Sequence, residues 1–219
     1  MSRMLDHTGR PRGGQMPGLV EATVQDNVDP ERMGRVRVVF PTLPGLPRSA
    51  WARRATPMAG KDRGWVSIPE IGDEVLVAFG HGSVHHAVIV GALFNGVDRP
   101  PYANEDRDNN LRVFRSRSGH TATFDDTDGA ERVELVTHDA SIRVVWDPVA
   151  RRLHVDSRGD IEVEATGDVT LTTQELSLSA LASFSMEAGG DVQVQAGEVV
   201  AVTSGGQAHA QSPDVAITP

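Results

Sequence analysis

The last third of the chain repeats a short apolar pattern, and this repeat restricts the possible folds more than any other feature. Pairs of apolar residues at positions i and i+2 recur every seven or eight residues. The pairs are Leu153 with Val155, Ile161 with Val163, Val169 with Leu171, Leu176 with Leu178, Phe184 with Met186, Val192 with Val194 and Val200 with Val202, then the weaker Ala208 with Ala210 and Val215 with Ile217. Gly, Asp, Ser and Thr between the pairs favour tight turns. The pattern predicts short strands, each with an apolar face only two residues wide.

Such strands cannot bury their apolar faces alone. A single-chain solenoid with three strands per coil needs about 24 residues per coil, so residues 153–219 would form fewer than three coils. If three copies each supply one face, every pair is buried against its symmetry mates. We therefore expect an intertwined triple-stranded β-helix, a homotrimeric needle whose core contains the seven strong pairs from Leu153 to Val202.

The region from residue 18 to 97 carries shorter period-2 runs bounded by Gly and Pro, which predict about 5 or 6 strands. The runs are LVEATVQ, GRVRVVF, WARRA, GWVSI, DEVLVAF and AVIVGALF. Alternation places Val36 and Val38 on a buried face and Arg35 and Arg37 in solvent. The number and spacing of the strands favour a small antiparallel barrel, because closure removes exposed edges.

Two further segments complete the predicted organisation. Residues 1–17 are rich in Gly and Pro and predict a flexible arm. Residues 98–152 predict a connector of β-hairpins, with turns at Asp126-Thr127-Asp128-Gly129 and Asp147-Pro148. The fold class is thus all-β, with an arm at 1–17, a barrel at 18–97, the connector at 98–152 and the needle at 153–219.

Charge and composition exclude several classes of protein. The chain has no cysteine, which removes disulfide scaffolds, thiolate metal sites and cysteine nucleophiles. The net charge of −9 falls entirely after residue 152, so nucleic-acid binding is disfavoured there. No apolar run approaches a membrane span and no secretory signal is visible, so we expect synthesis in the cytoplasm.

Several motifs resemble those of one known family. They are Gly34-Arg35-Val36-Arg37-Val38, Trp51-Ala52-Arg53, Gly64-Trp65, the run from Ile68 to Phe79, and Gly91-Ala92-Leu93-Phe94-Asn95-Gly96. They are similar to the oligonucleotide/oligosaccharide-binding (OB) barrel of central spike proteins, which include phage baseplate assembly protein V and the valine-glycine repeat protein G of type VI secretion. Ser118-Gly119-His120 and Phe124-Asp125-Asp126-Thr127 resemble the join between barrel and needle in that family.

The resemblance implies a function and a set of partners. It implies a membrane-piercing spike, assembled into the baseplate of a phage tail, a tailocin or an injection system, that contacts a target cell envelope transiently. Because only residues 1–17 precede the barrel, we expect a separate trimeric hub protein. A tip protein of the proline-alanine-alanine-arginine repeat type is expected on the blunt end, with its binding residues at Ser212, Pro213, Asp214, Val215 and Ile217.

Histidines offer the first candidates for other chemistry. His81, His85 and His86 lie in a predicted turn, where they could bind zinc but lack a carboxylate or thiolate partner. A solvated turn, or a contact with a neighbouring baseplate protein, is the simpler interpretation. His209 would approach its two symmetry mates near the tip, yet alternation with Ala208 and Ala210 points it outward. We expect no metal and no cofactor.

The other candidates for chemistry are Asp125, Asp126 and Asp128, and the pair Ser118 and His120. The aspartates precede Gly129 without the further oxygen ligands of a calcium loop, so a hairpin turn explains them. Ser118 and His120 lack a nucleophile elbow. We assign no catalytic residue and expect a non-enzymatic spike; the alternatives are a cell-wall hydrolase with a β-helical stalk and a monomeric OB-fold ligand-binding module.

Overall fold

A computed structural model describes residues 18–43, 49 and 51–201 of the chain. In this part, regular structure is almost entirely β-strand, with one short 3-10 turn, η2 (Gly80–Gly82). This confirms the all-β fold class. The chain divides into two compact units, Met1–Ile161 and Glu162–Pro219. Within the described ranges, no helix has the length and apolar character of a membrane span.

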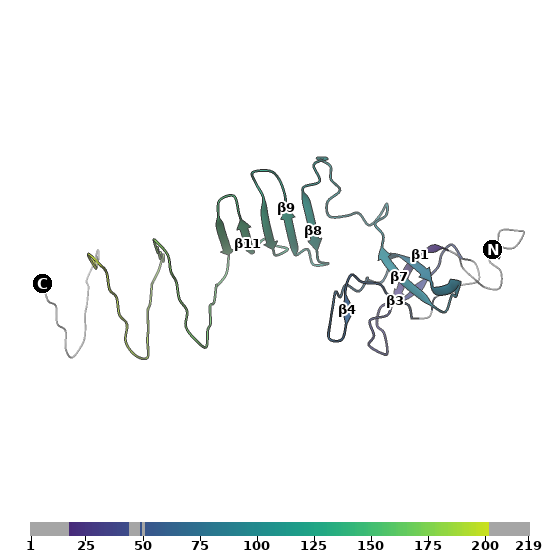
Figure 1. Cartoon of the computed structure of the whole chain (residues 1–219), viewed down its shortest axis with the longest axis horizontal. Coiled ribbons are helices and arrows are strands. Elements are labelled where there is room, and N and C mark those ends of the chain that lie inside the picture. The colour runs from purple at the N-terminus through teal and green to yellow at the C-terminus, as the bar shows by residue number, and fades with distance from the viewer. Residues whose placement is uncertain (1–17, 44–48, 50, 202–219) are drawn as a thin grey trace, which may run out of the picture. The chain divides into compact units, whose positions relative to one another are not determined.

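The first unit opens with a five-stranded sheet in the order β2-β1-β6-β7-β3. Its strands are β1 (Leu19–Asp26), β2 (Arg37–Val39), β3 (Arg53–Arg54), β6 (Glu74–Phe79) and β7 (Ala87–Ala92). All pairings are antiparallel except that of β3 with β7. Val36 and Ala52 exchange two backbone hydrogen bonds of 2.9 and 2.7 Å, which link the two edge strands of the sheet. The sheet therefore closes into the predicted barrel (Figure 1).

The barrel core consists of the inward residues of alternating strands. Val36, Val38, Val75 and Val77 are completely buried, and Phe40 stacks at a tilt on Phe79 with 5.5 Å between ring centroids. The prediction for the valines is thus confirmed. The prediction that Arg35 and Arg37 lie in solvent is wrong, because both side chains are partly buried in ion pairs. Arg35 binds Asp29 and Arg37 binds Asp26, each at 2.8 Å.

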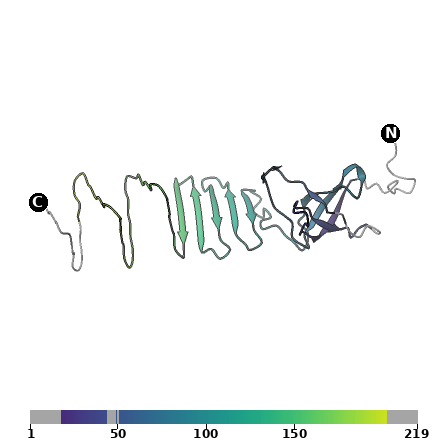
Figure 2. The same ribbon diagram turned by 90° about the horizontal axis from the view of Figure 1, so that it is seen from below.

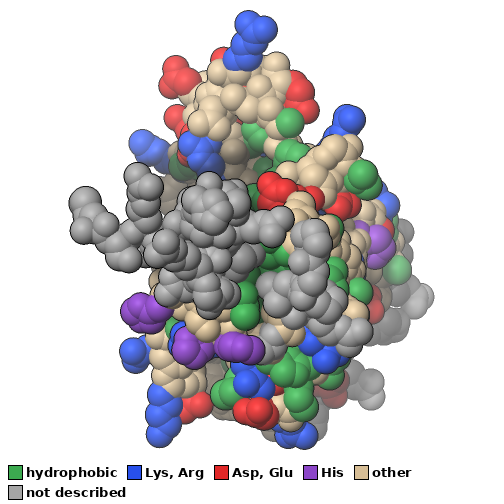
Figure 3. Space-filling view, turned by 90° about the vertical axis from the view of Figure 1, so that its right-hand side faces the viewer, with side chains coloured by type: hydrophobic (Ala, Val, Ile, Leu, Met, Phe, Trp, Pro, Cys, Tyr) green, Lys and Arg blue, Asp and Glu red, His purple; other side chains and the backbone are tan. Residues whose placement is uncertain are grey.

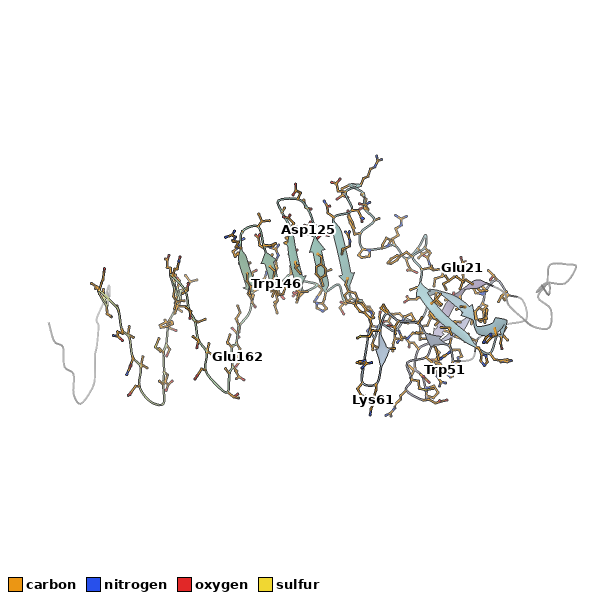
Figure 4. All side chains as sticks on the ribbon, in the orientation of Figure 1. Glu21, Trp51, Lys61, Asp125, Trp146 and Glu162 are labelled. Carbon is orange, nitrogen blue, oxygen red and sulfur yellow. The ribbon has the colours of Figure 1, made fainter. Side chains whose placement is uncertain are left out.

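A small hairpin extends from the barrel outside its main sheet. It pairs β4 (Ala59–Gly60) with β5 (Arg63–Gly64), and Lys61 lies at its tip (Figure 4). The predicted strand GWVSI is therefore wrong beyond Gly64, since residues 65–69 form no strand. They are held instead by single bonds, such as the 2.9 Å bond from the Trp65 amide to the Met58 carbonyl.

A second five-stranded sheet follows, in the simple order β12-β11-β10-β9-β8. Its strands are β8 (Leu111–Arg115), β9 (Thr121–Asp125), β10 (Arg132–Val136), β11 (Ile142–Asp147) and β12 (Arg152–Ser157). Each strand is antiparallel to its neighbours and joined to the next in a meander (Figure 2). The predicted hairpins are present, and β12 extends the sheet past the expected boundary at residue 152.

The described part of the second unit, residues 162–201, contains no strand. The chain is extended and bends at 166–167, 174, 181–182, 189–190 and 197–198. These bends have the same spacing as the apolar pairs and fall between them. Every described residue of this unit is exposed, so a single copy of the chain gives it no core.

Candidate assembly surface

The register of the sheet β8–β12 collects apolar side chains on one face. Residues directly opposite one another in an antiparallel pair point to the same side. Leu135 of β10 lies opposite Ala122 of β9 and Val144 of β11. The neighbouring strands continue this row, and a second apolar row lies two residues along. We call this surface the apolar face; its members are Phe114, Ala122, Leu135, Ile142, Val144, Val155, Phe124, Val133, Trp146 and Leu153.

The apolar face is uncovered in the single chain. Phe114 is 57% exposed and Phe124 is 53% exposed, and Trp146 still exposes 43% of its surface. A shallow groove of about 400 Å³ crosses this face, with Phe114, Leu135 and Val144 in its lining. Soluble monomers rarely expose contiguous apolar surfaces of this kind unless the surface binds something.

The opposite face of the same sheet is charged. Arg132 and Asp125 form an ion pair at 3.0 Å, and Arg152 and Asp147 approach within 3.8 Å. Arg143 also binds Glu134. Long charged side chains cover apolar atoms while their charged ends stay in water. The sheet thus has one face suited to solvent and one suited to packing.

Asp125 and its neighbours serve the turn between β9 and β10. The Asp125 carboxylate accepts hydrogen bonds from the hydroxyl of Thr127 at 2.5 Å and from its amide at 3.1 Å. The Thr127 hydroxyl bond is the main cause that holds the pKa of Asp125 below its usual value. The interpretation of Asp125, Asp126, Asp128 and Gly129 as turn residues agrees with these contacts.

Beyond the sheet, the chain carries the predicted series of apolar pairs. Leu153 and Val155 belong both to the first pair and to the apolar face. Val202, the last predicted core residue, lies outside the described residues. The weaker pairs, the arm at 1–17 and the predicted tip residues also lie outside them, the tip residues being Ser212, Pro213, Asp214, Val215 and Ile217.

The predicted core residues of the repeat are exposed, not buried, in a single copy of the chain. Their exposed fractions run from 48% for Val155 to 75% for Val163. The prediction places this burial between three copies, and a single copy gives these apolar faces no second layer to pack against. Their burial by other copies stays a prediction. The residues concerned are Leu153, Val155, Ile161, Val163, Val169, Leu171, Leu176, Leu178, Phe184, Met186, Val192, Val194 and Val200.

The predicted histidine positions are only partly described. His81, His85 and His86 lie in the turn between β6 and β7, as expected; His81 and His85 are exposed, and so is His86. In the described ranges, no three His, Asp or Glu side chains are arranged to hold a metal ion. His209 lies outside those ranges.

Ser118 and His120 lie between β8 and β9. The Nδ1 atom of His120 accepts a hydrogen bond of 3.3 Å from the amide of His138, and the two imidazole rings meet edge to face. The imidazole therefore has a partner in the turn between β10 and β11. No contact in the described part of the chain joins it to the Ser118 hydroxyl.

The connector residues of the apolar face were not among the predicted core residues. Leu135 and Trp146 each form an apolar i, i+2 pair, with Val133 and Val144, so the signal was present for them; Phe114 has Arg112 and Ser116 two residues away and carries no such signal. What the sequence did not supply is the register, and only the register shows that these runs place their apolar residues on one side.

Residues 20–94 match the family described as the type VI secretion system/phage-baseplate injector OB domain. These residues coincide with the barrel, from β1 to the end of β7. The barrel is thus similar to the injector OB domain. The match ends before β8, so the apolar face and the repeat both lie outside the injector OB domain.

Several curated proteins are similar over longer stretches. The type VI secretion system spike protein VgrG3 of Vibrio cholerae is 26% identical over 151 residues, which cover 65% of this chain and 14% of VgrG3. The spike protein VgrG1a of Pseudomonas aeruginosa is 30% identical over 165 residues, covering 65% of this chain and 25% of VgrG1a. A protein named actin cross-linking toxin VgrG1, also from V. cholerae, is 27% identical, covering 56% of this chain and 12% of the toxin.

These matches confirm the expected relationship to spike proteins. The aligned stretches are longer than the injector OB domain, so the similarity continues beyond the barrel. The chain spans at most a quarter of the length of the three relatives named above. This chain is therefore a relative of baseplate and secretion-system spike proteins that shares a limited part of them.

Proposed function

We propose that this chain is the central spike of a contractile particle and acts as a non-enzymatic homotrimer that pierces a membrane. The injector OB domain would be the base of the spike and the repeat its needle. The observation that carries the proposal is the exposure of apolar side chains in both units, on the apolar face of the sheet and at the pairs of the repeat. A single copy leaves both sets of side chains uncovered.

Threefold packing explains why the second unit has a regular spacing but no strands in one chain. Its bends recur with the apolar pairs, yet no neighbouring strand is available for backbone hydrogen bonds. Two further copies would supply both those bonds and the opposite sides of a dry core. Complete burial of a Val, Leu, Ile, Phe or Met side chain contributes about 1.5–3 kcal/mol, and the pairs of each chain supply eleven such side chains between Ile161 and Val200.

The mechanism in this proposal is mechanical. A needle of hydrogen-bonded strands around a dry core resists bending, and it concentrates the force of contraction on a small area of the target envelope. The acidic residues between the pairs, such as Asp168 and Asp191, would face water and keep the needle soluble. No step of this mechanism requires a catalytic residue, a metal or a cofactor.

Two partners complete the proposed assembly. A trimeric hub would hold the barrel end, and a tip protein of the proline-alanine-alanine-arginine repeat type would cover the end near residues 212–219. The particle would be a phage tail, a tailocin or an injection system. The injector OB domain and the spike relatives support the type of particle, and the two partners are inferences from the family resemblance.

Light-scattering mass measurement of the full chain tests the proposal directly. We expect a mass near three times 23.5 kDa, with slow amide hydrogen exchange between residues 161 and 200. The single chain has no strand there, so protection of these amides would report the intersubunit strands. A stable, folded monomer with unprotected amides in this stretch would overturn the architecture.

A further inference from the structure

A pocket on the barrel is separate from the apolar face and is not used by the proposed needle. It has a volume of about 500 Å³ and is lined by three segments: Met33 and Arg35, Trp51 and Arg53, and the turn residues His85, His86 and Ala87. Its size is within the range of ligand-binding pockets in proteins. Figure 3 shows a group of His side chains close to Lys and Arg side chains on the face that it views.

The polar side chains that line this pocket are nearly all hydrogen-bond donors. Arg35, Arg53 and Trp51 carry only N–H groups, and each neutral imidazole of His85 and His86 offers one acceptor beside its donor. The lining includes no Asp, Glu, Asn or Gln. A saccharide, which needs acceptors as well as donors, fits this lining poorly. A ligand that only accepts, such as a carboxylate, fits it well.

Neighbouring contacts show which positive charge is free to bind. The Arg35 guanidinium already makes two hydrogen bonds to Asp29, of 2.9 and 2.8 Å. Arg54 points to the other side of β3 and donates to the carbonyls of Gly34 and Ser67. Arg53 is exposed, and within the described ranges its guanidinium has no hydrogen-bond or ion-pair partner. Arg53 is therefore the charge that an incoming carboxylate would meet.

Apolar surface beside this charge narrows the class of ligand. Met33 is 59% exposed at one side of the pocket. Trp51 forms another wall, and its ring is held by the Arg37 guanidinium, whose carbon lies 5.1 Å from the ring centroid. Aromatic residues, Met and Arg are enriched in the buried centres of protein interfaces.

We propose that this pocket docks an acidic segment of a partner protein, in which a carboxylate binds Arg53 beside an apolar side chain packed on Trp51 and Met33. His85 and His86 supply further donors at the rim. All lining residues belong to one barrel, so the site does not depend on the proposed needle trimer. Failure of the trimer and failure of this site are consequently separate outcomes.

Fluorescence anisotropy of the full chain with a short labelled peptide tests the site. The probe is a fluorescein-labelled peptide in which aspartate alternates with leucine and phenylalanine, measured at physiological salt. We expect saturable binding with a dissociation constant of about 1 mM or tighter. Arg53→Gln should weaken it about tenfold, because a charge-assisted hydrogen bond is lost, and Arg53→Lys should restore part of the affinity.

Matched controls separate this site from general charge attraction. Arg63→Gln, on the exposed β5 strand of the small hairpin, should leave binding unchanged. A peptide with asparagine in place of aspartate should bind at least about tenfold more weakly. Any of three results overturns the proposal: no saturable binding, equal binding by Arg53→Gln and the unmodified chain, or displacement of the peptide by single-stranded DNA or an oligosaccharide at equal concentration.

Discussion

At the scale of single residues, the barrel depends on an ion pair that the alternating pattern did not reveal. Asp29 accepts amide hydrogen bonds from Glu31, Met33 and Arg35 at 3.0 to 3.1 Å, in addition to both bonds from the Arg35 guanidinium. These bonds, with the Arg35 side chain the largest cause, hold the pKa of Asp29 well below its usual range. One carboxylate thus fixes the loop between β1 and β2, just before the completely buried Val36.

The first prediction concerns Asp29→Asn, which keeps the size of the side chain and removes its charge. The folded pKa of Asp29 is depressed, so its contribution to stability is present above the unfolded value of roughly 3.9 and is lost as the pH falls below it. We expect the variant to melt several degrees below the unmodified chain at neutral pH, with the difference shrinking below about pH 4. Glu21→Gln is the control, since that side chain is exposed on β1 and has no ion-pair partner within the described residues. A difference in melting temperature that stayed constant down to about pH 2 would contradict the stabilising role of the Asp29 charge.

At the scale of elements, alternation predicted the strands wherever a neighbouring strand exists to pair with them. The runs that became β1, β6 and β7 and the five strands β8–β12 were all visible in the sequence. The run GWVSI has the same appearance but becomes a strand only at Gly64. It follows the small hairpin β4–β5, which lies outside the main sheet, so nothing provides a ladder for Trp65 to Ile68.

The sequence predicted only part of the candidate assembly surface, because the rest depends on how the strands pair. The repeat from Leu153 identifies its apolar pairs by spacing alone. The apolar face of β8–β12 depends on which residues lie opposite one another, for example Leu135 and Val144, and a single sequence does not contain that register. The pocket around Arg53 was missed because its three segments are distant in the chain and meet only when the barrel closes.

The second prediction compares Val194→Asp with its neighbour Gln193→Asp. In the proposed needle, Val194 points to the axis, so the variant brings three like charges together without a counter-ion, at a cost of several kcal/mol for each unpaired buried charge. Gln193 lies between Val192 and Val194 and points outward by alternation. We expect Val194→Asp to give monomers and Gln193→Asp to give trimers by light scattering. Equal behaviour of the two variants would show that alternation does not describe this segment.

At the scale of the whole molecule, the three parts of the chain differ in how much of their apolar burial and backbone hydrogen bonding is complete within one copy. The barrel has a closed core, with Val36 and Val77 completely buried. The sheet β8–β12 has its backbone hydrogen bonds but leaves Phe114 and Leu135 uncovered. The described part of the second unit has neither strands nor core. In the proposed trimer, dependence on other copies would therefore increase along the chain.

This gradient leads to the last prediction, for a chain that ends at residue 161, the last residue of the first unit. The barrel and the sheet keep all their internal pairings in this variant, so its circular dichroism should still show β-structure. It keeps the apolar face but loses the later pairs, ten buried side chains per copy from Val163 to Val200 worth about 1.5–3 kcal/mol each in the proposed trimer. We therefore expect it to remain folded but to dissociate on dilution at concentrations where the full chain stays trimeric. If light scattering gave the truncated chain the same resistance to dilution as the full chain, the sheet alone would account for assembly and the repeat would not be the main intersubunit core.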